Sequence, residues 1–172
     1  MLSSGLHWWW AVTLASTLET RIRYTPTDCF ETFPQPELTE AVTKAGGALD
    51  AHRRALMLER WEGLTKTYNR VHDPDERAEG IVELRRLHVE LDHAVAVAYG
   101  WDDLPMDHNF HETRQGIRYT LSPTTRTDVL DRLLELNHQR AAAEAAAGVT
   151  RPRRGGARRR RPADGQTSLE AL

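Results

Sequence analysis

The hydrophobic pattern of residues 1–37 changes from that of a helix to that of a strand. A helix is expected from Gly5 to about Ala15, with Ser4 as its N-cap, because a serine oxygen can accept a bond from a free backbone N–H of the first turn. From residue 18 to residue 24 apolar and polar positions alternate, which predicts one half-buried strand. Its outer face is charged and carries Glu19, Arg21 and Arg23.

Helical spacing dominates the next segment, and Pro34 and Pro36 keep the chain extended before it. Gly46 and Gly47 lie inside this stripe and favour a bend or break, since each glycine costs about 1 kcal/mol relative to alanine in a helix. The apolar positions recur at intervals of three, four or seven: Leu38, Val42, Ala45, Leu49, Leu56, Trp61, Leu64 and Tyr68.

Two further helices are expected, the first from about Glu76 to Tyr99 and the second from Pro123. Asp73 or Asp75 can cap the first, and Gly100 stands where a left-handed C-cap residue belongs. A loop of about fifteen residues and a short strand at 116–122 connect the two helices. Their apolar faces are Ile81, Leu84, Leu87, Leu91, Val95 and Ala98 in the first, and Val129, Leu130, Leu133, Leu134 and Leu136 in the second.

The charge of the chain is unevenly distributed. The formal net charge of −2 combines 23 basic and 25 acidic residues. Residues 151–172 hold seven of the basic residues and two of the acidic ones, which leaves residues 1–150 with 16 basic and 23 acidic residues and a formal charge of −7. The body is therefore no uniformly basic surface. Residues 148–172 have the composition of a disordered tail, which binds polyanions through counterion release.

The location of the protein is indicated by two features. Cys29 is the single cysteine, so no internal disulfide can form, and a cytoplasmic location is expected. The apolar run at 6–14 is too short to span a bilayer, and no lysine or arginine precedes it. It is interpreted as a packed helix, and no membrane contact is expected.

The sequence gives only weak support for catalytic or metal-binding groups. Ser3, Ser4 and His7 are better explained by a capped helix start than by nucleophilic catalysis. His88 and His93 lie five residues apart, do not share a helix face, and are interpreted as surface histidines. The best metal candidate is the set Asp107, His108, His111 and Glu112, but no other segment completes such a site.

No cofactor-binding motif is present in the sequence. It contains no glycine-rich strand-to-helix loop, no Walker sequence and no Asn-Pro-Pro-Tyr type motif. We therefore expect no catalytic, cofactor or metal residues. Arg21 and Arg23 have two interpretations, as partners of acids on a neighbouring strand or as contacts to phosphate or base edges.

Residues 2–37 and three later segments resemble one known family. Residues 2–37 show a Ser-Ser-x-x-His-x-x-Trp helix, a strand ending in Arg-Tyr, and Phe-Pro-x-Pro; the matching residues are Ser3, Ser4, His7, Trp10, Arg23, Tyr24, Phe33, Pro34 and Pro36. This resembles the end of the target-recognition domain of MmeI-like and type IIG adenine-specific DNA methyltransferases of restriction-modification and phage-defence systems. The segments "LTKTYNRVHDPDE", "LRRLHVELDHAVAVAYGW" and "VLDRLLELNHQRAAAE" resemble the helical C-terminal domain that follows in that family.

The resemblance implies a mainly α protein: an antiparallel helical unit preceded by a small α/β remnant of one helix and one or two strands. Residues 1–37 would be the remnant of the recognition domain, residues 38–147 the helical domain and residues 148–172 the tail. The implied partner is double-stranded DNA, together with a separately encoded catalytic part that uses S-adenosylmethionine. The candidate DNA-binding residues are Arg21, Arg23, Arg151, Arg153, Arg154, Arg158, Arg159, Arg160 and Arg161.

Two other hypotheses stay open: a small helical protein-interaction module with a nucleic-acid-binding arginine tail, and a non-functional gene remnant. If most of a recognition domain is missing, the strand at 18–24 lacks partners and the tryptophans at 8–10 are exposed. On that basis protease is expected to trim residues 1 to about 36 and to leave a helical core.

Overall fold

The protein is mainly helical, as the sequence predicts. The computed structural model describes residues 1–14, 16–18 and 21–148, and of residues 16–18 and 21–23 only the backbone. Both sheets in this part of the chain are two-stranded and antiparallel. The elements in chain order are α1 (Gly5–Leu14), β1 (Ser16–Leu18), β2 (Arg21–Arg23), the π-helix η1 (Pro26–Phe30), α2 (Glu40–Arg60), α3 (Leu64–Val71), α4 (Glu79–Ala98), β3 (Asn109–Thr113), β4 (Gly116–Thr120) and α5 (Pro123–Ala146).

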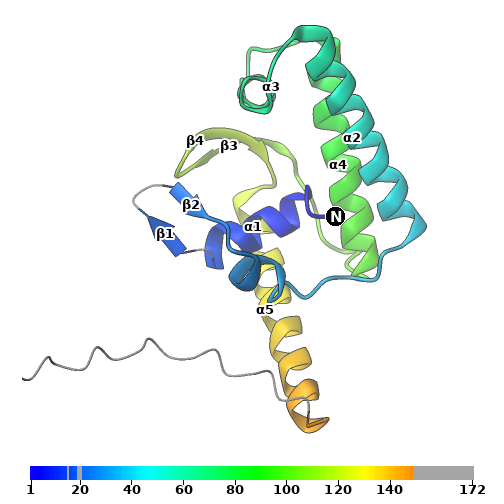
Figure 1. Ribbon diagram of the computed structural model, residues 1–172, viewed down its shortest axis with the longest axis vertical. Helices are drawn as coiled ribbons and strands as arrows, with labels where there is room; N and C mark the ends of the chain where they lie inside the picture. Colours follow the sequence, from blue (N-terminus) through cyan, green and yellow to red (C-terminus); the bar gives the residue numbers. More distant parts are fainter. Residues whose placement is uncertain (15, 19–20, 149–172) are drawn as a thin grey trace, which may run out of the picture.

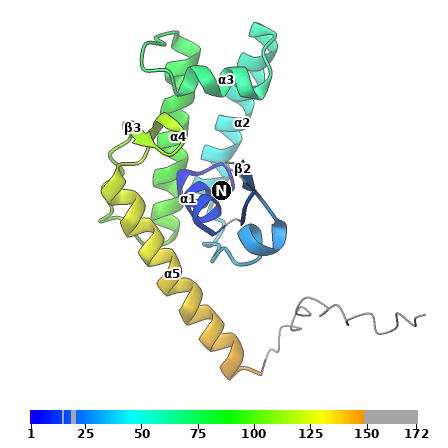
Figure 2. The same ribbon diagram turned by 90° about the vertical axis from the view of Figure 1, so that its left-hand side faces the viewer.

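Two long helices, α2 and α4, lie side by side and form the frame of the molecule (Figures 1 and 2). The short helix α3 crosses one end of this pair, and α1 packs near its middle. Both hairpins, β1–β2 and β3–β4, project on the same side, at the left of Figure 1. The helix α5 runs away from the body at the opposite end from α3.

Helix α2 is continuous, so the predicted bend at Gly46 and Gly47 is wrong. Thr39 caps it by accepting from the backbone N–H of Val42 at 3.2 Å. Three side chains seven residues apart bury its inner face: Val42, Leu49 and Leu56. Burying each is worth about 1.5–3 kcal/mol, which exceeds the cost of about 1 kcal/mol for each glycine.

The predicted apolar stripe of residues 38–68 does not continue past α2. Leu38 precedes the helix, Trp61 ends it in the left-handed conformation with φ 52°, and Leu64 opens α3; all three side chains are exposed. The stripe therefore covers two helices and a turn rather than one buried face. The helical spacing of apolar residues continues past Arg60, but the chain turns there and α3 begins at Leu64.

Helix α4 confirms the predicted apolar face. Its five large apolar positions from Ile81 to Val95 are buried, and Gly100 adopts φ 75° after its end. The helix begins at Glu79 rather than Glu76, and neither Asp73 nor Asp75 caps it. Instead, the Glu76 carboxylate accepts from the N–H of Ala78, the residue before the helix, at 3.0 Å.

Helix α5 also follows the prediction. Ser122 caps it by accepting from the N–H of Thr125 at 3.2 Å, and Pro123 occupies its first turn. Val129 and Leu133 are fully buried. The alanine-rich end at 141–147 is exposed along most of its length, in keeping with a helix formed by propensity rather than packing.

In place of the single strand predicted at 18–24 the chain forms a hairpin, which agrees with the one or two strands expected for residues 1–37. Leu18 pairs with Arg21, Thr17 with Ile22, and Ser16 with Arg23. A lone strand leaves its backbone donors unpaired, whereas a hairpin pairs them locally. The expected strand at 116–122 is present as β4, but its partner β3 lies in a segment predicted as a loop.

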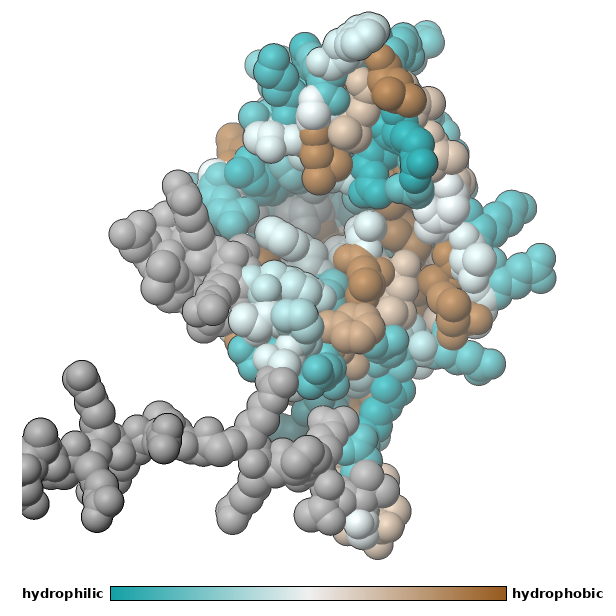
Figure 3. Space-filling model, in the orientation of Figure 1, coloured by the Kyte–Doolittle hydropathy of each residue, from teal (hydrophilic) through white to brown (hydrophobic). Residues whose placement is uncertain are grey.

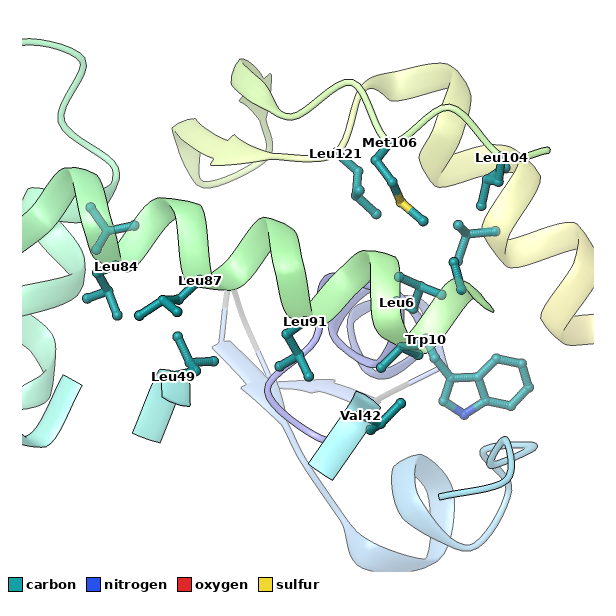
Figure 4. Close-up of a cluster of buried hydrophobic side chains, with 14 of the residues drawn as sticks. Leu6, Trp10, Val42, Leu49, Leu84, Leu87, Leu91, Leu104, Met106 and Leu121 are labelled. Atoms are coloured by element: carbon teal, nitrogen blue, oxygen red, sulfur yellow. The ribbon is translucent and has the colours of Figure 1, made fainter. Parts of the chain in front are cut away.

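One hydrophobic core spans the predicted boundary at residue 37. Leu6 and Trp10 of α1, together with Phe33, belong to the same buried cluster as the inner faces of α2, α4 and α5. Figure 4 shows Leu6 and Trp10 in the same cluster of buried side chains as Leu91 of α4. Trp10 is buried and Trp9 half-buried, so the expectation of three exposed tryptophans is wrong; only Trp8 is exposed.

In the described part of the chain, no helix combines the length and apolar character that a membrane crossing requires.

The shared core predicts that a substitution in α1 destabilises the whole chain. Leu6 has no exposed surface, so Leu6→Ala is expected to lower the free energy of unfolding by about 2–5 kcal/mol in a single transition. Urea unfolding followed by circular dichroism measures this. Leu2→Ala is the matched control, because the Leu2 side chain is 48% exposed and its loss should be nearly neutral. An unchanged main transition for Leu6→Ala would show that residues 1–37 fold separately.

Candidate nucleic-acid interface

The β1–β2 hairpin carries two of the predicted DNA-contacting residues. Arg21 and Arg23 stand at the two ends of β2, paired through the backbone with Leu18 and Ser16. Their side chains lie outside the described part of the structure. The seven arginines of residues 151–161 also lie outside it, so both predicted contact sets stay predictions.

The exit of β2 is fixed to α1 by an aromatic contact. The Tyr24 hydroxyl lies 3.1 Å from Nε2 of His7, which is buried on α1. The edge of the same imidazole meets Phe33, with ring centroids 4.6 Å apart. The hairpin therefore leaves the core at a defined point, held by residues from both sides of it.

His7 is a neutral structural group. Burial, followed by repulsion from the N-terminal ammonium, lowers its pKa to about 4. Ser4 Oγ accepts from the backbone N–H of His7 at 3.3 Å and does not meet the ring, and Ser3 is exposed. This geometry agrees with the capped helix start, and the hydroxyl beside the imidazole is that of Tyr24 rather than that of a serine.

A buried carboxylate joins α1 to α4. Asp92 Oδ1 accepts from the backbone N–H of Gly5 at 2.6 Å, and Asp92 Oδ2 accepts from Nε2 of His108 at 2.8 Å. A Cβ added at Gly5 would lie 2.7 Å from Oδ2, so the close approach requires a glycine here. Asp92 was not singled out by the sequence, because an acid on an amphipathic helix is usually a surface residue.

The metal candidate at 107–112 is not assembled. His108 points to Asp92, whereas His111 Nε2 lies 3.2 Å from the Asp107 carbonyl oxygen, and Glu112 is exposed. Within the described residues, no group of three histidine, cysteine, aspartate or glutamate side chains could hold a metal ion.

Residues in three of the four segments that carry the family resemblance contact one another. The Tyr68 hydroxyl of α3 lies 2.8 Å from Nε2 of His88 on α4, so His88 is not the surface residue expected; burial lowers its pKa. The Tyr99 hydroxyl donates to the Pro34 carbonyl oxygen at 3.0 Å, and burial raises the Tyr99 pKa. These residues therefore connect the segments to each other.

The β3–β4 hairpin is fixed to the body by Arg85, a buried arginine of α4. Its guanidinium donates to backbone carbonyl oxygens of the turn before α4, at 2.8 Å for Val71 and 2.7 Å for Asp73. It also lies under two rings of the hairpin, 5.0 Å from the Phe110 centroid and 5.6 Å from the Tyr119 centroid. Cation–π contacts of this kind hold the hairpin against α4.

The second hairpin adds cations on the same side as the first. Arg114 is exposed at its turn, and Arg118 lies in β4; neither forms an ion pair with a described residue. Both hairpins are seen from the front in Figure 2. We call this side the two-hairpin face. The sequence analysis did not single out Arg114 and Arg118, because β3 was not predicted. The available signal was the alternation of apolar and polar residues on both sides of Gly116, which has φ 89°.

Comparisons with family models, curated proteins and solved structures found no match to this chain.

The neutral state of His7 predicts a loss of stability in acid. Its pKa in the folded protein, about 4, lies below the value of 6.5 for a free histidine, so the unfolded chain takes up the proton first. The stabilisation is complete above pH 6.5 and is lost as the pH falls from 6.5 to about 4. Burial lowers the His72 pKa to about 4 as well, and adds to the effect.

Urea unfolding at a series of pH values measures this dependence. We expect His7→Gln to flatten the decline between pH 6.5 and about 4, and His138→Gln, at an exposed position of α5, to keep the original slope. Equal slopes for the original chain and His7→Gln would contradict the assignment of a neutral buried His7.

Proposed function

We propose that this chain is the DNA-recognition and C-terminal helical part of an MmeI-like adenine-specific DNA methyltransferase system. It would contribute docking and target selection, without methyl transfer of its own. The observation that carries the proposal is that residues from three of the four segments of the resemblance contact one another. Tyr68 meets His88, and Tyr99 meets Pro34.

The two-hairpin face supports contact with a DNA backbone. β2 has two arginines within three residues, and the second hairpin adds Arg114 and Arg118. A two-stranded ribbon is narrow enough to enter the major groove of B-DNA, and most side-chain contacts to DNA go to phosphate and sugar. In this proposal Arg21 and Arg23 contact phosphates and set the position of the protein on the duplex.

The arginine tail has a different part in the proposal. Its seven cations lie in residues 151–161, whereas residues 1–150 have a formal charge of −7. Contacts of a tail with phosphates are independent of sequence and release counterions. The tail therefore supplies affinity, and the anchored hairpin supplies orientation.

The methyl-transfer chemistry would belong to a separately encoded partner. In that reaction a methyl group passes from S-adenosylmethionine to the exocyclic amine of an adenine that is flipped out of the duplex. The described helices would hold the recognition hairpin in place relative to such a partner.

The salt dependence of DNA binding separates these roles. With all seven tail arginines engaged, the slope of log K against log salt contributed by the tail is about −6, and two hairpin arginines add about −2. Fluorescence anisotropy with a labelled duplex is the measurement. Deleting residues 149–172 should remove most of the affinity, and Arg21→Gln with Arg23→Gln should make the slope about 2 shallower.

Arg86→Gln is the matched control for charge, because Arg86 pairs with Glu83 and Glu90 at 2.7 Å each. It should leave the slope nearly unchanged. The proposal fails if the double hairpin variant keeps the slope of the original chain, or if the chain does not bind duplex DNA at low salt.

A further inference from the structure

The turn between α2 and α3 displays an unusual tryptophan. Trp61 is 94% exposed and ends α2 with φ 52° and ψ 38°, a conformation that glycine adopts more readily than any residue with a β-carbon. Leu58 on α2 and Leu64 on α3 are exposed beside it in the sequence. We call these three residues the Trp61 patch. Hydrophobic residues reach the surface over this end of α2 in Figure 3.

A hollow lies next to the patch on the same helix. It is a surface depression open to solvent, with a volume of about 340 Å³. Its apolar part comes from Met57, Leu58 and Leu64, and its polar part from Asp50, Arg53 and Arg54. Trp61 does not line it.

The side chains around the hollow suit an aromatic occupant. Asp50 pairs with Arg53 at 2.8 Å and with Arg54 at 3.0 Å, so the carboxylate offsets part of the positive charge. The Arg54 guanidinium remains largely exposed, and arginine stacks favourably on an indole ring. A tryptophan side chain therefore matches both the apolar floor and the arginine rim.

The chain itself supplies that side chain on the same surface. Residues four positions apart share a helix face, so Asp50, Arg54 and Leu58 follow one another along one side of α2, and Trp61 comes three residues after Leu58, at the end of the helix. The exposed indole and the hollow therefore lie one after the other along the chain at this end of α2. This is the requirement for a two-fold contact, in which each copy gives a group and receives the same group.

We propose that the Trp61 patch is a self-association surface. Two copies pair through antiparallel α2 helices, and Trp61 of each copy enters the hollow lined by Arg54, Met57 and Leu64 of the other. This proposal is independent of DNA binding, because the two-hairpin face and this end of α2 are different parts of the molecule (Figure 1).

Sedimentation velocity of the full chain, free of nucleic acid, tests the proposal across about a hundredfold range of protein concentration. We expect the sedimentation coefficient to rise from that of a monomer to that of a dimer. Trp61→Gly should remain monomeric throughout, and glycine suits the left-handed position, so its melting temperature in dilute solution should equal or exceed that of the original chain.

A second variant and a control complete the test. Leu64→Asp places a carboxylate at the floor of the hollow, and it should also prevent association while the exposed position tolerates the change. Trp8→Ala removes the exposed tryptophan of α1 and should leave the dimer intact. A chain that stays monomeric at every concentration, or a dimer that survives Trp61→Gly, or one that Trp8→Ala abolishes, would overturn the proposal.

Discussion

The arrangement of the molecule depends on the buried carboxylate of Asp92. One oxygen accepts from the first turn of α1 and the other from His108 in the segment before β3. A buried charge is costly unless it is fully hydrogen-bonded, and the N-terminus of a helix is a favourable place for a negative group. Asp92 is 3% exposed and meets both conditions. It therefore holds together segments that are far apart in the sequence, and it fixes α1, from which the β1–β2 hairpin emerges.

The local parts of the fold were predictable from the sequence. The buried faces of α4 and α5, the start of α5 at Pro123 and the left-handed Gly100 all follow from spacing and from residue type. Such features depend on neighbours within a few turns of the same helix. The pattern of α2 was recognised as well, but its end was not, because the helical spacing carries on through Trp61 while the chain turns.

The parts that depend on distant contacts were not predictable. The sequence did not indicate that Leu6 and Trp10 pack against α4, or that the segment with His108 and His111 pairs with β4. A polar strand and a buried aspartate look like surface residues until their partners are known. For the same reason the predicted boundary at residue 37 does not divide the hydrophobic core.

The motif residues acquire a physical meaning in this structure. Tyr68 with His88 and Tyr99 with Pro34 join one segment to another through single hydrogen bonds, and His7 joins α1 to the exit of β2. The Arg85 guanidinium lies against two aromatic rings of the second hairpin and holds it to α4. In the functions proposed above, recognition falls to residues outside these contacts, on the two-hairpin face and around Trp61.

The central claim is that α1 and the helices behind it form one cooperative unit, so that the hairpin is displayed by the core itself. Native-state hydrogen exchange tests this most directly, because it measures the free energy of opening for each element separately. We expect the slowest amides of α1, around Trp10, to exchange with the same opening free energy as those of α4 around Leu91. If the α1 amides exchange through a much less costly opening while those of α4 stay protected, residues 1–37 are an independent appendage and the account is wrong.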